Sequence, residues 1–388
     1  MKNKIAIISS RFPFPHNKGD KLRIFNQIKY LSASHEIHLI SLNTEKKIKP
    51  ENINHLKKYC QTINIINLNN ITIITNSLKA IFTNKPIQVG FFYSKSAHKK
   101  INYIIKQIKP KWIYSQLIRT SEYTKDYKFN IIDYMDCFSK GIERRIKNFP
   151  FFLKPLIKRE FKLTKIYEEE IFNNFKKHTI ITDNDRRFIN HKNNKDIIII
   201  PNGVDTNYYS PKKINKQYDL IFVGNMSYPP NIEAAEFICN QILPLIQKTI
   251  PNCNVLISGA TPHNRVKKLS NKYITINGWV DDIRNIYSSG KVFVAPMFIG
   301  TGLQNKLLEA MAMGIPCITT PLANNALLAN KSEIVIANNQ EDFASSCIEI
   351  IKDDFLAKKI SQKGLEFVRK KYNWNTINNN LKLLFNNG

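Results

Sequence analysis

Short apolar runs alternate with longer amphipathic segments along this chain, and the alternation occurs once in each half. Strands are expected at Lys4–Ser9, Glu36–Leu42, Ile63–Leu68, Trp112–Ser115, Asn130–Tyr134 and Thr179–Thr182, and again at Asp219–Val223, Val255–Ser258, Ile274–Ile276, Val292–Ala295, Cys317–Thr319 and Ile334–Ile336. Helices are expected at Lys18–Leu31, Ser94–Ile108, Ile157–Phe175, Asn231–Lys248, Gln304–Met313, Gln340–Ile351 and Asp354–Lys370. Strands that alternate with helices favour parallel sheets covered by helices on both faces. The sequence therefore predicts an α/β fold with two doubly wound domains, each binding ligands at the carboxyl ends of its strands.

The boundary between the two halves is expected near residues 200–217. Pro201-Asn202-Gly203 is a turn signal, because glycine adopts a positive φ without steric cost, and a polar stretch follows it. The length of 388 residues agrees with about two to three domains. We expect a first domain over 1–205, a second over 206–373, and a C-terminal segment, 374–388, that packs back on the first domain.

The cysteines and the lengths of the apolar runs indicate the cellular compartment of the protein. The six cysteines show no CxxC and no paired spacing, so they are interpreted as buried thiols rather than as a disulfide framework or a zinc site. The apolar runs are far shorter than the ~18–20 residues that span a bilayer. The first apolar run ends at Ser9, too early for a signal peptide. We therefore expect a cytoplasmic protein, peripheral on the inner face of the membrane where it touches one.

The basic charge has two interpretations. Lys and Arg number 58 against 30 Asp and Glu, a net charge of +28, and only 11 of the 58 are Arg. Nucleic-acid readers favour Arg, so nucleic acid is not the expected partner and the excess is interpreted as compositional drift toward Lys. An anionic membrane surface needs only point charges. Phe149, Phe151, Phe152 and Leu153 among lysines are the candidate membrane contact, with a buried helix junction as the alternative.

The most informative stretch is Pro296–Thr320. A glycine-bearing loop there follows an expected strand and enters an expected helix, with the residues Gly300, Thr301, Gly302 and Leu303. Backbone amides and the helix dipole make such a junction an anion site. Lys306 would add a positive charge to a diphosphate, and Glu309, three residues further on, could accept two hydroxyl hydrogen bonds from a ribose. The alternative is an ordinary strand–loop–helix with a surface Lys and Glu.

Leu307–Thr320 resembles the donor-site signature of the retaining GT-B glycosyltransferases of the large family 4 group. Other segments are similar to that family in the same order: Pro201–Asp205 to the interdomain segment, Phe222–Gly224 to the strand that opens the donor domain, and Asn277–Val280 to the turn that contacts the donor base. The subgroup associated with exopolysaccharide loci is resembled most closely, at Arg11–Pro13, Gly19–Arg23, Asp133–Ser139 and the loop before Lys306.

The resemblance implies a GT-B fold, in which two Rossmann-like domains face each other across a cleft. It implies a hexosyltransferase-type enzyme that moves a sugar with retention from a nucleotide sugar to a saccharide or lipid-linked acceptor in cell-surface or exopolysaccharide synthesis. No cofactor is implied. No metal is implied either, which agrees with the lack of an HxxxH or HExxH spacing. The donor-binding residues it implies are Gly19, Gly224, Asn225, Arg265, Gly278, Trp279, Val280, Gly300, Thr301, Gly302, Leu303, Lys306 and Glu309.

Asp136 is the third candidate catalytic residue, with Lys306 and Glu309. It follows the strand expected at Asn130–Tyr134, near the place where the family often has a histidine, and a carboxylate there could orient the acceptor hydroxyl or accept its proton. The alternative is that Asp136 or Ser139 caps the next helix. The acidic run Glu168–Glu170 is interpreted as a solvated helix face.

The chain departs from the family at three charged positions. The Arg and Lys that usually neutralise the diphosphate correspond to Asn225 and Pro230, and the first Glu of the usual pair corresponds to Thr301. Lys306 and Arg265 are the candidate replacements. These departures leave two alternatives to a transferase: a catalytically degenerate GT-B binding protein, and a nucleotide-sugar 2-epimerase.

Overall fold

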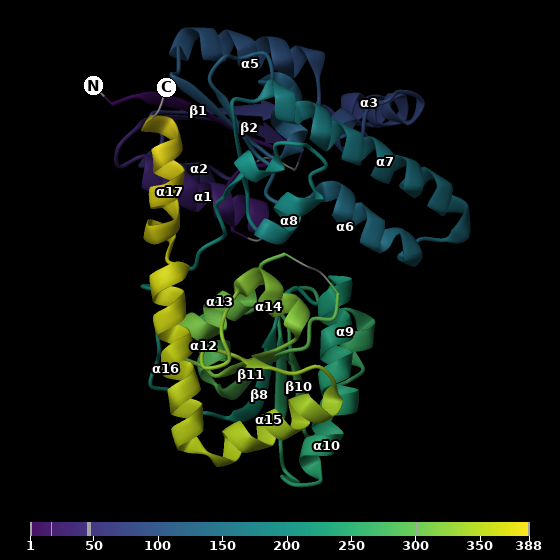
Figure 1. Cartoon of the computed structure of the whole chain (residues 1–388), viewed down its shortest axis with the longest axis vertical. Helices are drawn as coiled ribbons and strands as arrows, with labels where there is room; N and C mark the ends of the chain where they lie inside the picture. The colour runs from purple at the N-terminus through teal and green to yellow at the C-terminus, as the bar shows by residue number, and fades with distance from the viewer. Residues whose placement is uncertain (1, 17, 45–47, 300–301, 387–388) are drawn as a thin grey trace. The chain divides into compact units, whose positions relative to one another are not determined.

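The computed structural model describes residues 2–16, 18–44, 48–299 and 302–386 (Figure 1). The chain divides into two compact units. Unit 1 comprises Met1–Pro201 and Ile377–Gly388, and unit 2 comprises Asn202–Thr376. Each unit is built on its own parallel sheet.

The sheet of unit 1 has seven strands in the order β3-β2-β1-β4-β5-β6-β7, and all its pairs are parallel. Its strands are β1 Lys4–Ser9, β2 Glu36–Asn43, β3 Thr62–Asn67, β4 Trp112–Gln116, β5 Asn130–Asp133, β6 Lys177–Ile180 and β7 Ile198–Ile199. Its helices are α1 Gly19–Leu31, α2 Pro50–Lys57, α3 Asn70–Phe82, α4 Ile87–Phe92, α5 Lys95–Ile108, α6 Phe138–Arg145, α7 Lys154–Glu170 and α8 Asp183–Phe188. Short 3₁₀ turns lie at Ile118–Tyr123, Ile146–Asn148, Phe151–Leu153, Ile171–Asn174 and Asn194–Asp196.

The sheet of unit 2 has six strands in the order β10-β9-β8-β11-β12-β13, again with parallel pairs throughout. Its strands are β8 Tyr218–Val223, β9 Val255–Ser258, β10 Ile274–Asn277, β11 Gly290–Ala295, β12 Cys317–Thr319 and β13 Val335–Ile336. Its helices are α9 Pro229–Phe237, α10 Leu243–Gln247, α11 Asn264–Lys267, α12 Ile283–Ser288, α13 Asn305–Ala312, α14 Pro321–Leu327, α15 Gln340–Lys352 and α16 Asp354–Lys371. A π-helical turn, Ile238–Ile242, joins α9 to α10. The doubly wound α/β fold predicted for both halves is therefore confirmed.

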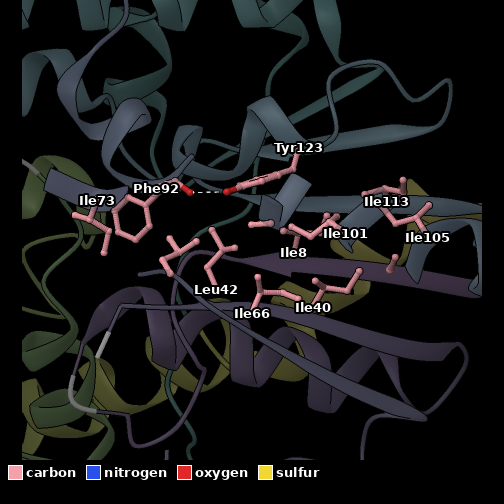
Figure 2. Close-up of a cluster of buried hydrophobic side chains, with 13 residues drawn as sticks. Ile8, Ile40, Leu42, Ile66, Ile73, Phe92, Ile101, Ile105, Ile113 and Tyr123 are labelled. Atoms are coloured by element: carbon pink, nitrogen blue, oxygen red, sulfur yellow. Dashed lines mark hydrogen bonds between the residues drawn. The ribbon is translucent and has the colours of Figure 1, made fainter. Parts of the chain in front are cut away.

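The core of unit 1 forms where apolar residues of β1 and β2 face the helices on one side of the sheet. Ile8, Ile40 and Leu42 are fully buried and pack against Ile101 of α5 (Figure 2). Helix α5 forms because its apolar residues recur at helical spacing and because the Ser94 hydroxyl caps its first turn. Residues buried on both faces of a parallel sheet form near-continuous apolar strands, which explains why these strands were visible in the sequence.

The C-terminal helix α17, Trp374–Asn386, ends in unit 1. The ring of Phe385 lies against the rings of Trp112 and Tyr114, and Tyr30 donates a hydrogen bond to Asn379. These contacts bury apolar residues of α17 against the first sheet.

Several helices do not follow the expected ranges. Helices α2, α3, α4 and α6 were not predicted, and the helix expected to begin at Ile157 begins at Lys154. Helices α2, α4 and α6 span eight residues or fewer, too few for hydrophobic periodicity to detect, whereas α3 has apolar residues at helical spacing and was overlooked.

Candidate functional site

The candidate site of unit 2 lies where the strand order reverses. Strands β8 and β11 are neighbours in the sheet although β9 and β10 separate them in sequence. Ligands of doubly wound sheets bind at the carboxyl ends of the strands at such a point. The predicted residues of this unit follow four carboxyl ends: Gly224 and Asn225 after β8, Arg265 after β9, Gly278, Trp279 and Val280 after β10, and Gly302, Leu303, Lys306 and Glu309 after β11.

Two glycines allow the loops after β8 and β9 to approach each other. Gly259 has a φ of 150°, and a Cβ on it would lie 1.6 Å from the carbonyl oxygen of Gly224. A Cβ on Gly224 would lie 2.8 Å from Nδ2 of Asn231. A side chain fits at neither position, so both loops stay close to the sheet edge.

Asn225 organises its own loop. Its side-chain oxygen accepts hydrogen bonds from the backbone and hydroxyl of Ser227, at 3.0 and 2.8 Å, and from the hydroxyl of Thr261, at 3.0 Å. Asn231, on α9, donates to the Asn225 carbonyl at 2.9 Å. Asn225 thus holds the backbone of this loop without supplying the positive charge that the family usually has at this position.

Lys306 points into the site from the first turn of α13. Its ammonium donates to Oδ1 of Asn231, lies 3.7 Å from Sδ of Met297 and lies 4.9 Å from the centre of the Phe222 ring. Among the described residues no carboxylate forms an ion pair with it. Removal from water lowers the pKa of Lys306 to about 7, although Glu309 opposes the shift. An ammonium in such surroundings gains a partner when an anion binds.

Glu309 lies one turn further along α13 and is half-buried. Tyr287 donates a hydrogen bond to its Oε2 at 2.7 Å, and Tyr209 forms a second hydrogen bond with the carboxylate. Burial raises the pKa of Glu309 to about 7, and the two tyrosines and Lys306 oppose the rise. A carboxylate fixed by two phenols keeps lone pairs for further donors, as a ribose would supply.

The remaining donor-site predictions have mixed outcomes. Gly300 and Thr301 lie outside the described residues. Gly302 and Leu303 lie in the loop that enters α13, and Gln304 donates to the carbonyl of Gly302 at 3.0 Å. Gly278 and Val280 are half-buried in the turn after β10, and Trp279 is 72% exposed. These positions remain candidates.

Arg265 is already paired. It forms an exposed ion pair with Glu236 on α9, with Nε 2.8 Å from Oε1. Its charge is thus offset by a neighbouring carboxylate, and Lys306 is the better placed of the two cations proposed to replace the missing Arg and Lys.

In unit 1, Gly19 is the first residue of α1, and its neighbour Asp20 binds Arg11 at 2.6 Å instead of capping the helix. Asp136 is exposed at the carboxyl end of β5, directly after Met135, which has a φ of 60°. Although solvent reaches Asp136, the surrounding protein and the carboxylate of Asp185 raise its pKa to about 7.

Helix α6, which follows Asp136, is capped by the Glu168 side chain of α7. The backbone amides of Phe138 and Ser139 donate to the Glu168 carboxylate, at 2.6 and 3.3 Å, and Glu168 is 1% exposed. The interpretation of Glu168 as part of a solvated face was therefore wrong, and so was the alternative that Asp136 or Ser139 caps this helix. Glu168 is buried because an anion at a helix N-terminus satisfies amides that have no partner within the helix.

Three residues of the site were missed from the sequence. Asn231, Tyr209 and Tyr287 lie on different segments, and each contacts Lys306 or Glu309 only through the folding of unit 2. None stands within a recognisable motif, so the sequence carries no local signal for them.

Solved structures share the architecture over their whole length. Sucrose-phosphate synthase from Thermosynechococcus elongatus aligns with a TM-score of 0.70 at 14% identity, over 99% of this chain and 98% of that one. WaaG, a glycosyltransferase involved in lipopolysaccharide biosynthesis, aligns with a TM-score of 0.66 at 12% identity, over 99% of this chain and 100% of that one. The fold is the GT-B fold of glycosyltransferases, as expected from the sequence.

The sequence comparisons find similarity to glycosyltransferases, with the family match confined to unit 2. Residues 217–353 match the family described as Glycosyl transferases group 1. A Klebsiella pneumoniae protein named "Uncharacterized 44.6 kDa protein in cps region" is 23% identical over 95% of this chain and 96% of its own length. An Escherichia coli UDP-Gal:alpha-D-GlcNAc-diphosphoundecaprenol alpha-1,3-galactosyltransferase is 27% identical over 41% of this chain, a match that covers 46% of that enzyme. The family match over unit 2, the glycosyltransferase relatives and the GT-B neighbours together support a glycosyltransferase.

Proposed function

We propose that the protein transfers a sugar from a uridine diphosphate sugar to a lipid-linked saccharide, with retention at the anomeric carbon, in cell-surface or exopolysaccharide synthesis. The observation that carries the donor assignment is the placement of Lys306 and Glu309 on α13, at the carboxyl end of β11. The choice of nucleotide follows relatives: the E. coli enzyme is named for UDP-Gal, and a neighbour with the same fold, Anabaena HepE, was crystallised with UDP and glucose. The acceptor class follows the name of the E. coli enzyme.

In this proposal Glu309 accepts the ribose hydroxyls and Lys306 faces the diphosphate. The amides of the loop and of the first turn of α13 add hydrogen bonds to the phosphates, and Gly278, Trp279 and Val280 frame the base. Bound diphosphate restores the proton on Lys306, since a nearby anion favours the charged form. The same charge stabilises the nucleoside diphosphate as it leaves, which is where electrostatic catalysis acts.

Asp136 is the proposed acceptor-side carboxylate, and Gly19 is proposed as a donor-binding residue on the family resemblance alone. A carboxylate with a raised pKa accepts a proton efficiently near neutral pH, and this is the role that the acceptor hydroxyl requires. No cofactor or metal is part of the proposal.

The first experiment is a thermal-shift titration with UDP, UDP-sugars and other nucleoside diphosphates. A ligand at 100 times its dissociation constant stabilises the folded state by about 2.7 kcal/mol. We expect stabilisation by uridine nucleotides that Glu309→Ala abolishes. Glu349→Ala, which removes an exposed carboxylate of the same unit, is the matched control and should respond as wild type does. A chain that no nucleotide stabilises would contradict the proposal.

Turnover separates the two alternatives. A degenerate binding protein would bind UDP-sugar without releasing UDP. An epimerase would convert the UDP-sugar to its C2 epimer without an acceptor and without net release of UDP, whereas the transferase releases one UDP for each sugar that the acceptor takes up. A radiolabelled UDP-sugar incubated with a lipid extract distinguishes these results.

We also propose that unit 1 docks on an anionic membrane. It carries 39 Lys and Arg against 16 Asp and Glu, a net charge of +23, whereas unit 2 carries 19 against 14, a net charge of +5. The segment from Asn52 to Ser121 holds 11 Lys and Arg and no Asp or Glu. So uneven a distribution argues against drift as the sole source of the charge. Among the described residues, no helix is both long and apolar enough to cross a bilayer.

Exposed apolar side chains accompany this charge. Helix α3 exposes Ile71, Ile74, Leu78 and Phe82 at helical spacing, and Phe82 is 87% exposed. Phe151 lies in the 3₁₀ turn Phe151–Leu153, directly before α7, and is 83% exposed. Its neighbour Phe152 is exposed as well. Arg159 of α7 donates to the carbonyl of Thr83, directly after α3, so the two apolar features lie on neighbouring elements. A second copy of unit 1 is the less favourable occupant, because it would bring two strongly positive surfaces together.

Vesicle sedimentation tests this docking. The double variant Phe151→Ser with Phe152→Ser, and separately Phe82→Ser, should weaken binding to phosphatidylglycerol-containing vesicles by about tenfold or more, from the loss of buried apolar area. Phe355→Ser removes an equally exposed ring from unit 2 and serves as the control. Unchanged binding by the double variant would contradict the proposal.

A further inference from the structure

Unit 1 has a hollow of its own at the carboxyl ends of three adjacent strands. Arg11 follows β1, Thr44 follows β2 and Arg119 follows β4, in the sheet order β2-β1-β4. The strand order reverses between β1 and β4, so the hollow lies at the ligand-binding edge of this sheet. Its volume is about 310 Å³, at the lower end of the range for small-molecule sites, and its lining comprises Arg11, Lys18, Thr44, Ile87, Gln88, Phe91, Phe92 and Arg119.

Among the described residues, the lining has three cationic side chains and no carboxylate. Arg11 is paired with Asp20, while Arg119 donates two hydrogen bonds to the amide oxygen of Gln88, at 3.1 and 3.0 Å. Within the described part of the chain, no carboxylate lies in ion-pair distance of Arg119. Its guanidinium lies between the rings of Phe92 and Phe138, 5.0 Å from each centre. Burial and the charge of Arg11 lower the pKa of Arg119 to about 10.

Removing a cation from water costs free energy, which the two aromatic rings and Gln88 offset in part and a bound anion would offset further. Phosphate groups suit two arginines, because the planar guanidinium donates two parallel hydrogen bonds to their oxygens. The chemistry of this lining therefore selects a phosphate or diphosphate.

Three of the other lining residues are apolar and belong to helix α4. Ile87, Phe91 and Phe92 belong to α4, whose first amides, of Ile87 and Gln88, donate to the carboxylate of Glu160. The Tyr123 hydroxyl donates to the carbonyl of Phe92 at 2.7 Å and anchors the other end of the helix (Figure 2). Helix α4 in turn packs closely on α3, where a Cβ on Gly90 would lie 2.9 Å from that of Ala80. The cationic side chains of the hollow thus lie beside an apolar wall formed by α4. Helix α4 in turn packs against α3, the helix that exposes apolar side chains.

We propose that this hollow binds the phosphate or diphosphate of a lipid-linked acceptor, with Arg119, Lys18 and Arg11 on the phosphate oxygens. The first carbons of the lipid lie along Phe91 and Ile87. This inference rests on the proposed function and assigns the acceptor a chemical class and a place in unit 1, apart from the donor residues of unit 2.

Calorimetric titration with geranyl diphosphate, in the presence of saturating UDP, tests the assignment. Arg119→Gln should weaken binding by about 10- to 100-fold, the range for a hydrogen bond to a charged group. Lys18→Gln, at an exposed position, should weaken binding severalfold without a change in melting temperature, which separates loss of the site from loss of the fold. Arg187→Gln, an exposed arginine of the same unit, is the matched control and should bind as wild type does.

Two further ligands separate the parts of the acceptor. Inorganic pyrophosphate should bind more weakly than geranyl diphosphate, and Phe91→Ala should remove that difference. Geraniol, which lacks the phosphates, should not bind.

Two results would overturn the proposed acceptor site, and a third would contradict the proposed function instead. Equal weakening by Arg119→Gln and Arg187→Gln would mean diffuse attraction to a basic unit and would overturn the site. Displacement of geranyl diphosphate by UDP would put the ligand in the donor site and would overturn it as well. Absence of UDP binding, in contrast, contradicts the proposed transferase and removes the acceptor role, whatever the hollow binds.

Discussion

The buried ion pair between Arg23 and Asp133 should dominate the stability of unit 1. Arg23 lies on α1 and Asp133 ends β5, and both side chains are 0% exposed. The guanidinium donates to both carboxylate oxygens, at 2.7 and 3.0 Å, and Thr179 of β6 donates to Asp133 at 2.9 Å. The pair therefore ties the first helix to two strands, beside the loop that carries Asp136.

The expected magnitude follows from this burial. Asp133→Asn leaves an arginine charge inside the protein without its counter-ion, which costs about 3–5 kcal/mol, whereas a well-packed apolar replacement of both partners costs little. For a unit of this size, that cost lowers the melting temperature by about 6–20 °C. Arg23→Met should cost a similar amount, and the double variant Arg23→Met with Asp133→Leu should recover most of the loss.

Differential scanning calorimetry with hydrogen exchange measures this loss unit by unit, which is needed because two units need not unfold together. Amides of β1, β4 and β5 should lose protection while those of β8 and β11 keep theirs. Asp183→Asn, which breaks an exposed pair with Arg187 in the same unit, is the control and should cost about 1 kcal/mol or less. A cost below about 1 kcal/mol for Asp133→Asn, or a double variant as unstable as the sum of the single ones, would refute the reasoning.

Three other outcomes follow from the structure. Affinity for UDP should peak near pH 7 and fall by at most about tenfold per pH unit on each side, because Glu309, with a pKa raised to about 7, gains a proton below that pH and Lys306, with a pKa lowered to about 7, loses one above it. Calorimetry between pH 5 and 9 checks this, and Lys306→Met should remove the alkaline decline. Gly259→Ala should destabilise unit 2 by about 1–3 kcal/mol or prevent its folding, while Gly278→Ala, where a Cβ meets nothing within 4 Å, should change the melting temperature little. All six cysteines are buried with raised thiol pKa values, so a thiol reagent such as dithionitrobenzoate should react with native protein slowly and with unfolded protein at six sites.

The resemblance to glycosyltransferases could be recognised in the sequence because the residues that carry it lie close together along the chain. Leu307–Thr320 lies on one helix and the next strand, so residue spacing along the chain preserves the geometry of Lys306 and Glu309. Surface aromatic residues were harder to interpret: Phe151 and Phe152 gave two alternatives, and the structure excludes the buried junction because both rings are exposed. The missed partners of the site, such as Tyr287 and Asn231, come from other helices, and no spacing rule connects them to α13.

The sequence by itself determined the two parallel sheets, because fully buried strands need continuous apolar runs and the crossover helices need an amphipathic face. Tertiary structure alone decided how charges are partnered. It buried Glu168 as a cap for α6, gave Arg265 a carboxylate, and placed Arg119 between two aromatic rings with no described carboxylate in ion-pair distance. The physical reason is that burial follows from patterns along one element, whereas the environment of a charge depends on side chains that meet only when distant elements pack.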